Sequence, residues 1–169
     1  MLALGIDPGS AICGYGFVEL DGSQTVAKNF GVITTSPNAR MQDRLLKIHT
    51  ELDALIKNFR PDVMGIEKLF FGKNVTTAIP VGQARGVVLL CAAQNNLDVT
   101  EISPNEVKQS ITGYGAANKE QVIYMVTKLL KLDEPPKPDD AADALAIALA
   151  AGYETNSLAR RNFFLTANN

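Results

Sequence analysis

Four acidic residues are spaced so that they can share a divalent metal ion. Asp7 and Glu67 each end a short apolar run, and a residue at the end of a buried strand points into the cleft at the edge of a sheet. Asp140 and Asp143 are three positions apart at the start of an alanine-rich segment, so they lie on one face of a helix. Converging carboxylates repel one another unless a cation lies between them. Mg²⁺ prefers oxygen ligands, so the pattern predicts a magnesium site.

Such a site has a defined chemistry. Two Mg²⁺ ions about 3.5–4 Å apart hold the attacking and leaving oxygens of a phosphodiester in line, one activating water and the other stabilising the departing 3′ oxygen. Taken singly, Asp7 is also explained as a turn acid, and Asp139 and Asp140 as helix-capping acids. Unpaired acids that face the interior are rare, so all four together favour the metal site. Spacing alone leaves open whether Asp139 or Asp140 pairs with Asp143.

The strands that position the first two acids are short. The segments ending at Asp7 and Glu67 are apolar throughout, which indicates buried strands, and two longer β-rich segments are joined by the turn Asp21-Gly22-Ser23. Strands are expected at residues 2–7, 15–20, 25–35, 63–67 and 98–102. If the first and fourth of these strands are neighbours, Asp7 and Glu67 come together at one edge of the sheet.

Helices are expected between and after these strands. Ser103 and Glu106 have the spacing of a capping box, Asn118 caps the next helix, and Pro138 suits the first turn of the last one. The expected helices cover residues 39–59, 75–95, 104–112 and 118–132, with the last beginning at Pro138. The helix at 75–95 is apolar nearly all round, so part of it is expected to face another subunit.

The order of elements and the composition indicate one α/β domain. A mixed central sheet with helices on both faces is expected over residues 1–153, followed by a flexible tail at 154–169. The 169 residues are 46% hydrophobic and 20% charged, as in ordinary globular proteins. Cys13 and Cys91 lack metal-binding spacing and are expected to be reduced thiols of a cytoplasmic protein. Neither a signal peptide nor a membrane span is expected.

The net charge does not by itself suit a nucleic-acid partner. It is −2 at neutral pH, whereas nucleic-acid-binding domains are typically basic. If the four candidate metal ligands are set aside, 14 acids remain against 16 lysines and arginines. Charge therefore leaves both a mildly acidic surface and a nucleic-acid partner open.

Several motifs in order along the chain resemble those of the RuvC family of Holliday junction resolvases, over about residues 2–150. The motifs are Gly5-Ile6-Asp7-Pro8-Gly9-Ser10, Gly14-Tyr15-Gly16, Ile66-Glu67, Phe70 with Lys73-Asn74, Gly82-Gln83-Ala84-Arg85-Gly86, Val107-Lys108-Gln109 and Asp140-Ala141-Ala142-Asp143-Ala144-Leu145-Ala146-Ile147. The resemblance implies an RNase H-like fold and a symmetric homodimer. It further implies that two opposed strands of a four-way DNA junction are cut with Mg²⁺ or Mn²⁺, during recombination and repair.

The resemblance also implies roles for particular residues. It places the catalytic and metal-binding acids at Asp7, Glu67, Asp140 and Asp143, with one or two ions per subunit, and so prefers Asp140 to Asp139. It further implies branch-migration partners of the RuvA and RuvB type.

The DNA contacts that the resemblance implies begin with Lys108 and Lys119, which match basic residues near the scissile phosphate. Phe70 follows Glu67 in a loop and is expected either to stack on unpaired bases or to pack into the core. The remaining candidates for phosphate contacts are Lys73, Asn74 and Arg85. Asp139, Arg160 and Arg161 receive no role.

Three other functions compete with this interpretation. Residues 5–10 also resemble the first phosphate loop of sugar kinases and actin-like ATPases, but those proteins normally have two such domains and this chain has one. A single-domain nuclease of the same fold acting on structured RNA is the second. A junction-binding protein that no longer cuts is the third, and the intact acids argue against it.

Overall fold

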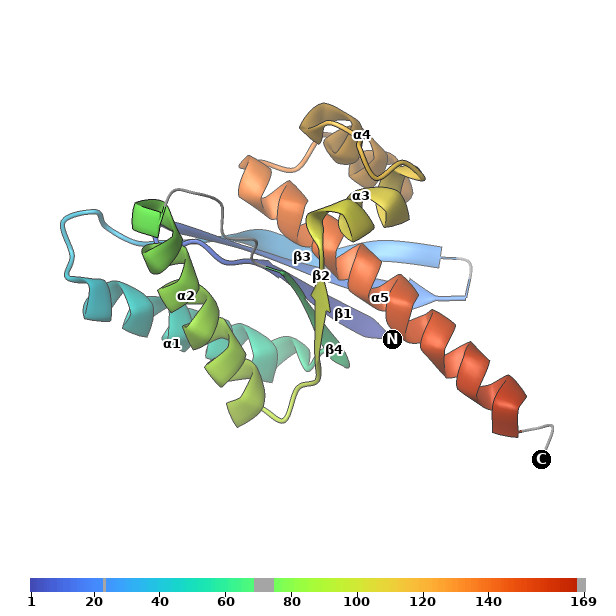
Figure 1. Cartoon of the computed structure of the whole chain (residues 1–169), viewed down its shortest axis with the longest axis horizontal. Helices are drawn as coiled ribbons and strands as arrows, with labels where there is room; N and C mark the ends of the chain where they lie inside the picture. The colour runs from blue at the N-terminus through green and yellow to red at the C-terminus, as the bar shows by residue number, and fades with distance from the viewer. Residues whose placement is uncertain (23, 69–74, 167–169) are drawn as a thin grey trace.

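The computed structural model describes the chain except for residues 23, 69–74 and 167–169 (Figure 1). Within the described residues, five strands form one mixed sheet in the order β3-β2-β1-β4-β5. Their bounds are β1 (Leu2–Asp7), β2 (Ile12–Asp21), β3 (Gln24–Thr34), β4 (Val63–Glu67) and β5 (Val99–Ile102). The first three strands are antiparallel neighbours, whereas β4 is parallel to both β1 and β5. Since β1 and β4 are neighbours, the condition under which Asp7 and Glu67 come together at one edge is met.

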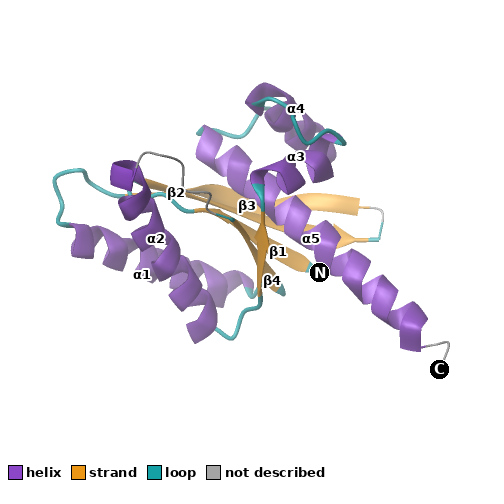
Figure 2. Cartoon of the chain, viewed as in Figure 1, coloured by secondary structure: helices purple, strands orange, loops and turns teal. Residues whose placement is uncertain are grey.

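Helices cover both faces of this sheet, as expected (Figure 2). They are α1 (Met41–Phe59), α2 (Val75–Gln94), α3 (Pro104–Thr112), α4 (Lys119–Leu129) and α5 (Asp139–Thr166). One hydrophobic core forms between the sheet and the pair α1 and α2, and a second core joins the opposite face to α3, α4 and α5. In the described residues, no helix is long and apolar enough to cross a membrane.

Alternation along β1 and β4 determines where the strand-end acids point. Leu4 and Ile6 are fully buried in the core beneath α1 and α2. Gly5, between them, lies against the backbone of α5. Since successive side chains of a strand point to opposite faces, Asp7 lies on the α5 face. The same alternation along β4 brings Glu67 to that face.

Two glycines allow α5 to lie directly on the sheet. A Cβ atom on Gly5 would stand 2.0 Å from the carbonyl oxygen of Ala144, and one on Gly14 would stand 2.1 Å from that of Asp140. No side chain fits in these contacts, so the glycines let the first turns of α5 pack against β1 and β2. This close approach holds Asp140 and Asp143 near the end of β1.

The helix starts that the sequence predicts are confirmed. Ser103 and Glu106 form the reciprocal hydrogen bonds of a capping box at the start of α3, and Asn118 and Gln121 do the same for α4. These bonds satisfy backbone N–H groups that a helix start leaves without partners. They fix the starts of the two helices that carry Lys108 and Lys119.

Several element bounds differ from those expected, among them the start of α1 at Met41 and the end of α4 at Leu129, and two of the differences involve glycines. The second strand begins at Ile12 rather than Tyr15, because Gly14 pairs with Asp7 in the ladder despite the low strand propensity of glycine. The last helix continues past Gly152 to Thr166. Gly152 does not end it, because the absence of a side chain lets the helix pack against Leu20 at this point. The expected flexibility of residues 154–169 stays a prediction.

Candidate active site

Three of the four predicted acids line one pocket on the α5 face of the sheet. The pocket has a volume of about 240 Å³. Its charged lining residues are Asp7 from β1, Glu67 from β4, Lys108 from α3, Lys119 from α4 and Asp143 from α5. The pocket thus forms where five elements meet, and its acids come from three segments that are distant in the sequence.

Asp7 is held where its charge is disfavoured. Burial raises the pKa of Asp7 to about 7, and repulsion from the carboxylates of Asp143, Asp140 and Glu67, in that order, adds to the effect. Lys119 acts in the opposite direction. A carboxyl group whose ordinary pKa is near 3.8 is therefore partly protonated at neutral pH, and a nearby cation would favour its ionised form.

The two other acids of the pocket are affected in the same way. Burial raises the pKa of Glu67, with a further contribution from Asp143, while Lys108 lowers it. Burial also raises the pKa of Asp143, against a hydrogen bond from Lys119 that lowers it. The pocket consequently carries an excess of negative charge that two lysines balance in part.

Lys119 connects the pocket to the acids at the start of α5. Its Nζ atom lies 3.1 Å from Oδ2 of Asp143 and 3.3 Å from Oδ2 of Asp139. Asp139 thus forms an ion pair with Lys119. Spacing in the sequence alone could not tell whether Asp139 or Asp140 belongs to the metal site with Asp143. Asp140 is not among the residues that line the pocket, but its charge raises the pKa of Asp7.

The donor set suits a hard divalent cation. The pocket offers three carboxylates and neither His nor Cys, which is the ligand chemistry of Mg²⁺. In the part of the chain that the structure describes, no three acidic, His or Cys side chains are already arranged as the ligands of one ion. Asp143 is instead paired with Lys119.

The predicted DNA contacts have separate outcomes. Lys108 and Lys119 line the acidic pocket. Phe70, Lys73 and Asn74 lie outside the described residues. Arg160 and Arg161 fall in the last turns of α5, where only the backbone is described.

The guanidinium of Arg85 bonds to two residues of the same chain. The residue is only 9% exposed, and its guanidinium donates to the backbone oxygen of Glu67 at 2.5 Å and to the carboxylate of Glu101. The guanidinium of Arg85 is therefore buried and bonded within the protein, and its predicted phosphate contact stays a prediction. The partner Glu101 was missed, since nothing in its sequence neighbourhood marks it.

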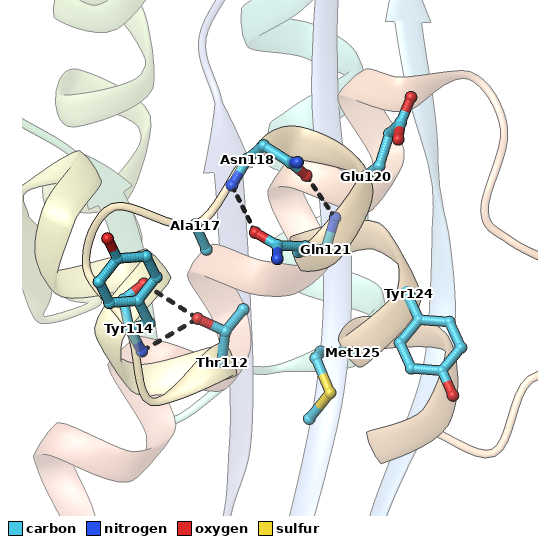
Figure 3. Close-up of a pocket in the computed structure, with 8 residues that line it drawn as sticks. All are labelled: Thr112, Tyr114, Ala117, Asn118, Glu120, Gln121, Tyr124 and Met125. Carbon is cyan, nitrogen blue, oxygen red and sulfur yellow. Dashed lines mark hydrogen bonds between the residues drawn. The ribbon is translucent and has the colours of Figure 1, made fainter.

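A second pocket lies between α3 and α4 (Figure 3). It has a volume of about 420 Å³ and is lined by Thr112, Tyr114, Ala117, Asn118, Glu120, Gln121, Tyr124 and Met125. Thr112 bonds to the backbone of Tyr114, and Asn118 and Gln121 bond to each other's backbone N–H groups. These polar groups stabilise the helix ends and are engaged within the chain, and Glu120 is the one charged residue in the described lining of this pocket.

The fold and the site together define a class. A mixed five-stranded sheet flanked by helices, with acids at the ends of its two central strands and at the start of a final helix, is the RNase H-like fold. A sequence model described as "Crossover junction endodeoxyribonuclease RuvC" matches residues 3–151. The chain belongs to the RuvC family.

Curated relatives and solved structures resemble nearly the whole chain. A crossover junction endodeoxyribonuclease RuvC of Heliobacterium modesticaldum is 51% identical over 90% of this chain and 94% of its own length. That of Caldicellulosiruptor saccharolyticus is 53% identical over 94% and 96%. The structure of T. thermophilus RuvC in complex with a Holliday junction substrate is 36% identical and covers 92% of this chain and 94% of its own, with a TM-score of 0.87.

Proposed function

We propose that this protein is a crossover junction endodeoxyribonuclease that resolves four-way DNA junctions by paired nicks in recombination and repair. The observation that carries the proposal is the acidic pocket at the adjoining ends of β1 and β4, in a chain that belongs to the RuvC family. The similar T. thermophilus RuvC was solved in complex with a Holliday junction substrate, which supports junction DNA as the substrate here.

In this proposal, Asp7, Glu67, Asp140 and Asp143 hold the catalytic metal. Bound Mg²⁺ or Mn²⁺, as one or two ions, supplies the positive charge that activates water and stabilises the leaving oxygen. The acids provide oxygen ligands whose raised pKa values reflect crowded negative charge, which a divalent cation relieves. The metal is thus held where the ends of two strands and one helix meet.

The two lysines of the pocket have a role of their own in the proposal. Lys108 and Lys119 place positive charge beside the acids, where it attracts and positions a DNA phosphate without reading sequence. Lys119 also opposes the rise that burial causes in the pKa of Asp143, through a hydrogen bond and its positive charge. Phe70, Lys73 and Asn74 complete the proposed DNA surface on the strength of the family resemblance.

We also propose that the protein acts as a homodimer through α2. Ile79 and Leu90 are 57% and 54% exposed, and they recur with Gly86 at helical spacing on one face. A Cβ atom on Gly86 would have nothing within 4 Å among the described residues outside its own helix backbone, so a second helix can approach closely. A two-fold junction requires two equivalent sites, which a symmetric dimer provides.

Two further expectations accompany the proposal. The free, buried cysteines Cys13 and Cys91 fit the reducing cytoplasm. Cooperation with branch-migration proteins of the RuvA and RuvB type is expected from the family resemblance.

The test is cleavage of a synthetic four-way junction with and without Mg²⁺. The Asp7→Asn variant should cleave more than about 100-fold more slowly, because residues that merely support metal ligands already account for 10–100-fold. Its junction binding in EDTA should be equal or tighter, since removing a negative charge reduces repulsion of phosphates. Asp43→Asn, an exposed acid paired with Arg40 on α1, is the matched control and should cleave normally.

Two results would count against this function. One is equal cleavage of the junction by Asp7→Asn and the wild-type protein. The other is faster hydrolysis of a structured RNA than of the junction when both are offered together, which would favour the RNA-cleaving alternative.

A further inference from the structure

Arg85 is a buried cation that binds the end of the strand carrying Glu67. Its Nη1 atom donates to the Glu67 carbonyl oxygen at 2.5 Å, and its Nη2 atom donates to the carboxylate of Glu101 on β5. The arginine side chain is 11% exposed and the Glu101 side chain 50%. One residue of α2 therefore joins the last residue of β4 to the neighbouring strand.

This contact is made from the face of the sheet opposite the acidic pocket. Ile102 belongs to the core beneath α3, α4 and α5, so the preceding residue, Glu101, points toward α2. Ala84, next to Arg85, and Val88 belong to the core beneath α1 and α2. The Glu67 side chain enters the acidic pocket on one face, while the guanidinium binds the Glu67 backbone from the other.

The bond to the Glu67 carbonyl satisfies a group at the end of the strand. At this point the ladder between β4 and β5 ends, with Lys68 N–H donating to Ile102 at 2.7 Å. A half-buried carbonyl at a strand end needs a donor from elsewhere, and Arg85 provides it. The charge of the guanidinium is balanced by Glu101, so the arrangement is complete within the chain.

We propose that Arg85 is a positioning residue for the cleavage reaction. By holding the carbonyl of Glu67, it fixes the backbone at the end of β4, and this directs the Glu67 carboxylate toward the metal-binding position of the pocket. The inference rests on the proposed function. It also gives α2 two roles, because the same helix carries the exposed face of Ile79, Gly86 and Leu90 proposed for the second subunit.

The experiment compares Arg85→Met and Arg85→Lys with the wild-type protein. In Arg85→Met the aliphatic stem remains but both hydrogen bonds are lost, so the cleavage rate at saturating junction should fall about 10–100-fold. Mn²⁺ affinity without DNA, measured from the electron paramagnetic resonance signal of free Mn²⁺, should fall by a similar factor. Arg85→Lys should recover part of both, because an ammonium can still donate to one of the two oxygens.

Three controls separate positioning from other effects. Junction binding in EDTA, and its dependence on salt, should be unchanged in both variants. Arg40→Met, an exposed arginine at the N-cap of α1 that pairs with Asp43, should behave as the wild-type protein does. Circular dichroism and light scattering should show that Arg85→Lys keeps the wild-type fold and oligomeric state, so this variant carries the test if Arg85→Met does not fold.

The proposal is overturned if Arg85→Lys and any folded Arg85→Met keep both the wild-type cleavage rate and the wild-type Mn²⁺ affinity. It is also overturned if junction binding weakens as much as cleavage and its salt slope falls by about 1, because that is the behaviour of a phosphate contact. Failure of the proposed function would look different: the wild-type protein itself would not cut the junction, while the Mn²⁺ measurement would still test the role of Arg85.

Discussion

At the scale of single residues, Asp7 shows the conflict between burial and charge in the pocket. Its carboxyl group is removed from water and faces three other acids, which raises the pKa of Asp7 to about 7. Such an arrangement costs stability whenever the group must ionise in the folded protein. Buried functional sites commonly carry this cost, because the same crowding of carboxylates produces affinity for a cation.

This cost predicts how stability depends on pH. The folded-state pKa of Asp7 lies above its ordinary value of 3.8, so between pH 4 and pH 7 the unfolded chain has lost a proton that the folded protein keeps. In EDTA, the free energy of unfolding of the wild-type protein should therefore fall as pH rises through this window, by up to about 4 kcal/mol from this group. Asp7→Asn should lack this contribution in urea denaturation curves measured from pH 4 to 8.

The same urea denaturation curves should also be measured with Mg²⁺ added. At pH 8 the ion should raise the midpoint of wild-type unfolding and leave that of Asp7→Asn much less changed, because a ligand stabilises the state that binds it. Parallel pH curves for the two proteins, or equal stabilisation by Mg²⁺, would contradict this assignment of Asp7.

At the scale of elements, the site depends on how closely α5 approaches the sheet. The helix lies on β1 and β2 at Gly5 and Gly14, where a Cβ atom would overlap the helix backbone. Backbone cannot move aside as a flexible side chain can, so these contacts fix the distance between the helix and the strands. The acids of α5 reach the acids of the strands because of this distance.

Gly5→Ala should therefore be strongly destabilising. The added methyl group would stand 2.0 Å from the carbonyl oxygen of Ala144, and relief requires α5 to move, at a cost of about 3 kcal/mol or more. Urea denaturation measures this cost. Gly115→Ala is the matched control, because its Cβ atom would be no closer than 3.5 Å to its neighbours, and its stability should change by less than about 0.5 kcal/mol. Equal stability of the two variants would contradict the packing argument.

At the scale of the whole molecule, the two faces of the sheet carry different surfaces: one carries the acidic pocket, and the other is covered by the helix proposed to form the dimer. The face covered by α3, α4 and α5 carries the acidic pocket. On the other face, α2 packs inward with Ala84 and Val88 and exposes Ile79 and Leu90 outward. A dimer formed through α2 would leave the pockets of both subunits open to the two arms of a junction, since the pocket lies on the opposite face.

Leu90→Asp tests this arrangement. The side chain is 54% exposed in the single chain, so the variant should fold, whereas a charge buried between two subunits should weaken the dimer at least about 100-fold. Light scattering at micromolar concentration should show a dimer for the wild-type protein and a monomer for the variant. Val26→Asp, an exposed apolar residue on β3, should remain dimeric. A wild-type monomer, or a variant that stays dimeric, would refute the α2 interface.

The sequence by itself determined much of the local structure and the list of candidate acids. Capping residues such as Ser103 and Asn118 mark helix starts through hydrogen bonds to neighbours three positions away, so they can be recognised from spacing alone. The short apolar runs before Asp7 and Glu67 likewise indicate buried strands, and the motif order indicates the family. Such signals are local, because they depend on the period of a helix or a strand.

Only the tertiary structure decided which distant groups meet. In the folded chain, Lys119 forms ion pairs with both Asp139 and Asp143. The buried Arg85 side chain bonds to Glu67 and Glu101. The last helix, α5, continues past Gly152. The periodicity around Arg85 does not reveal whether its side chain meets solvent or a strand end. That outcome depends on segments 16 or more residues away, whose position relative to α2 is set by the packing of helices on both faces of the sheet.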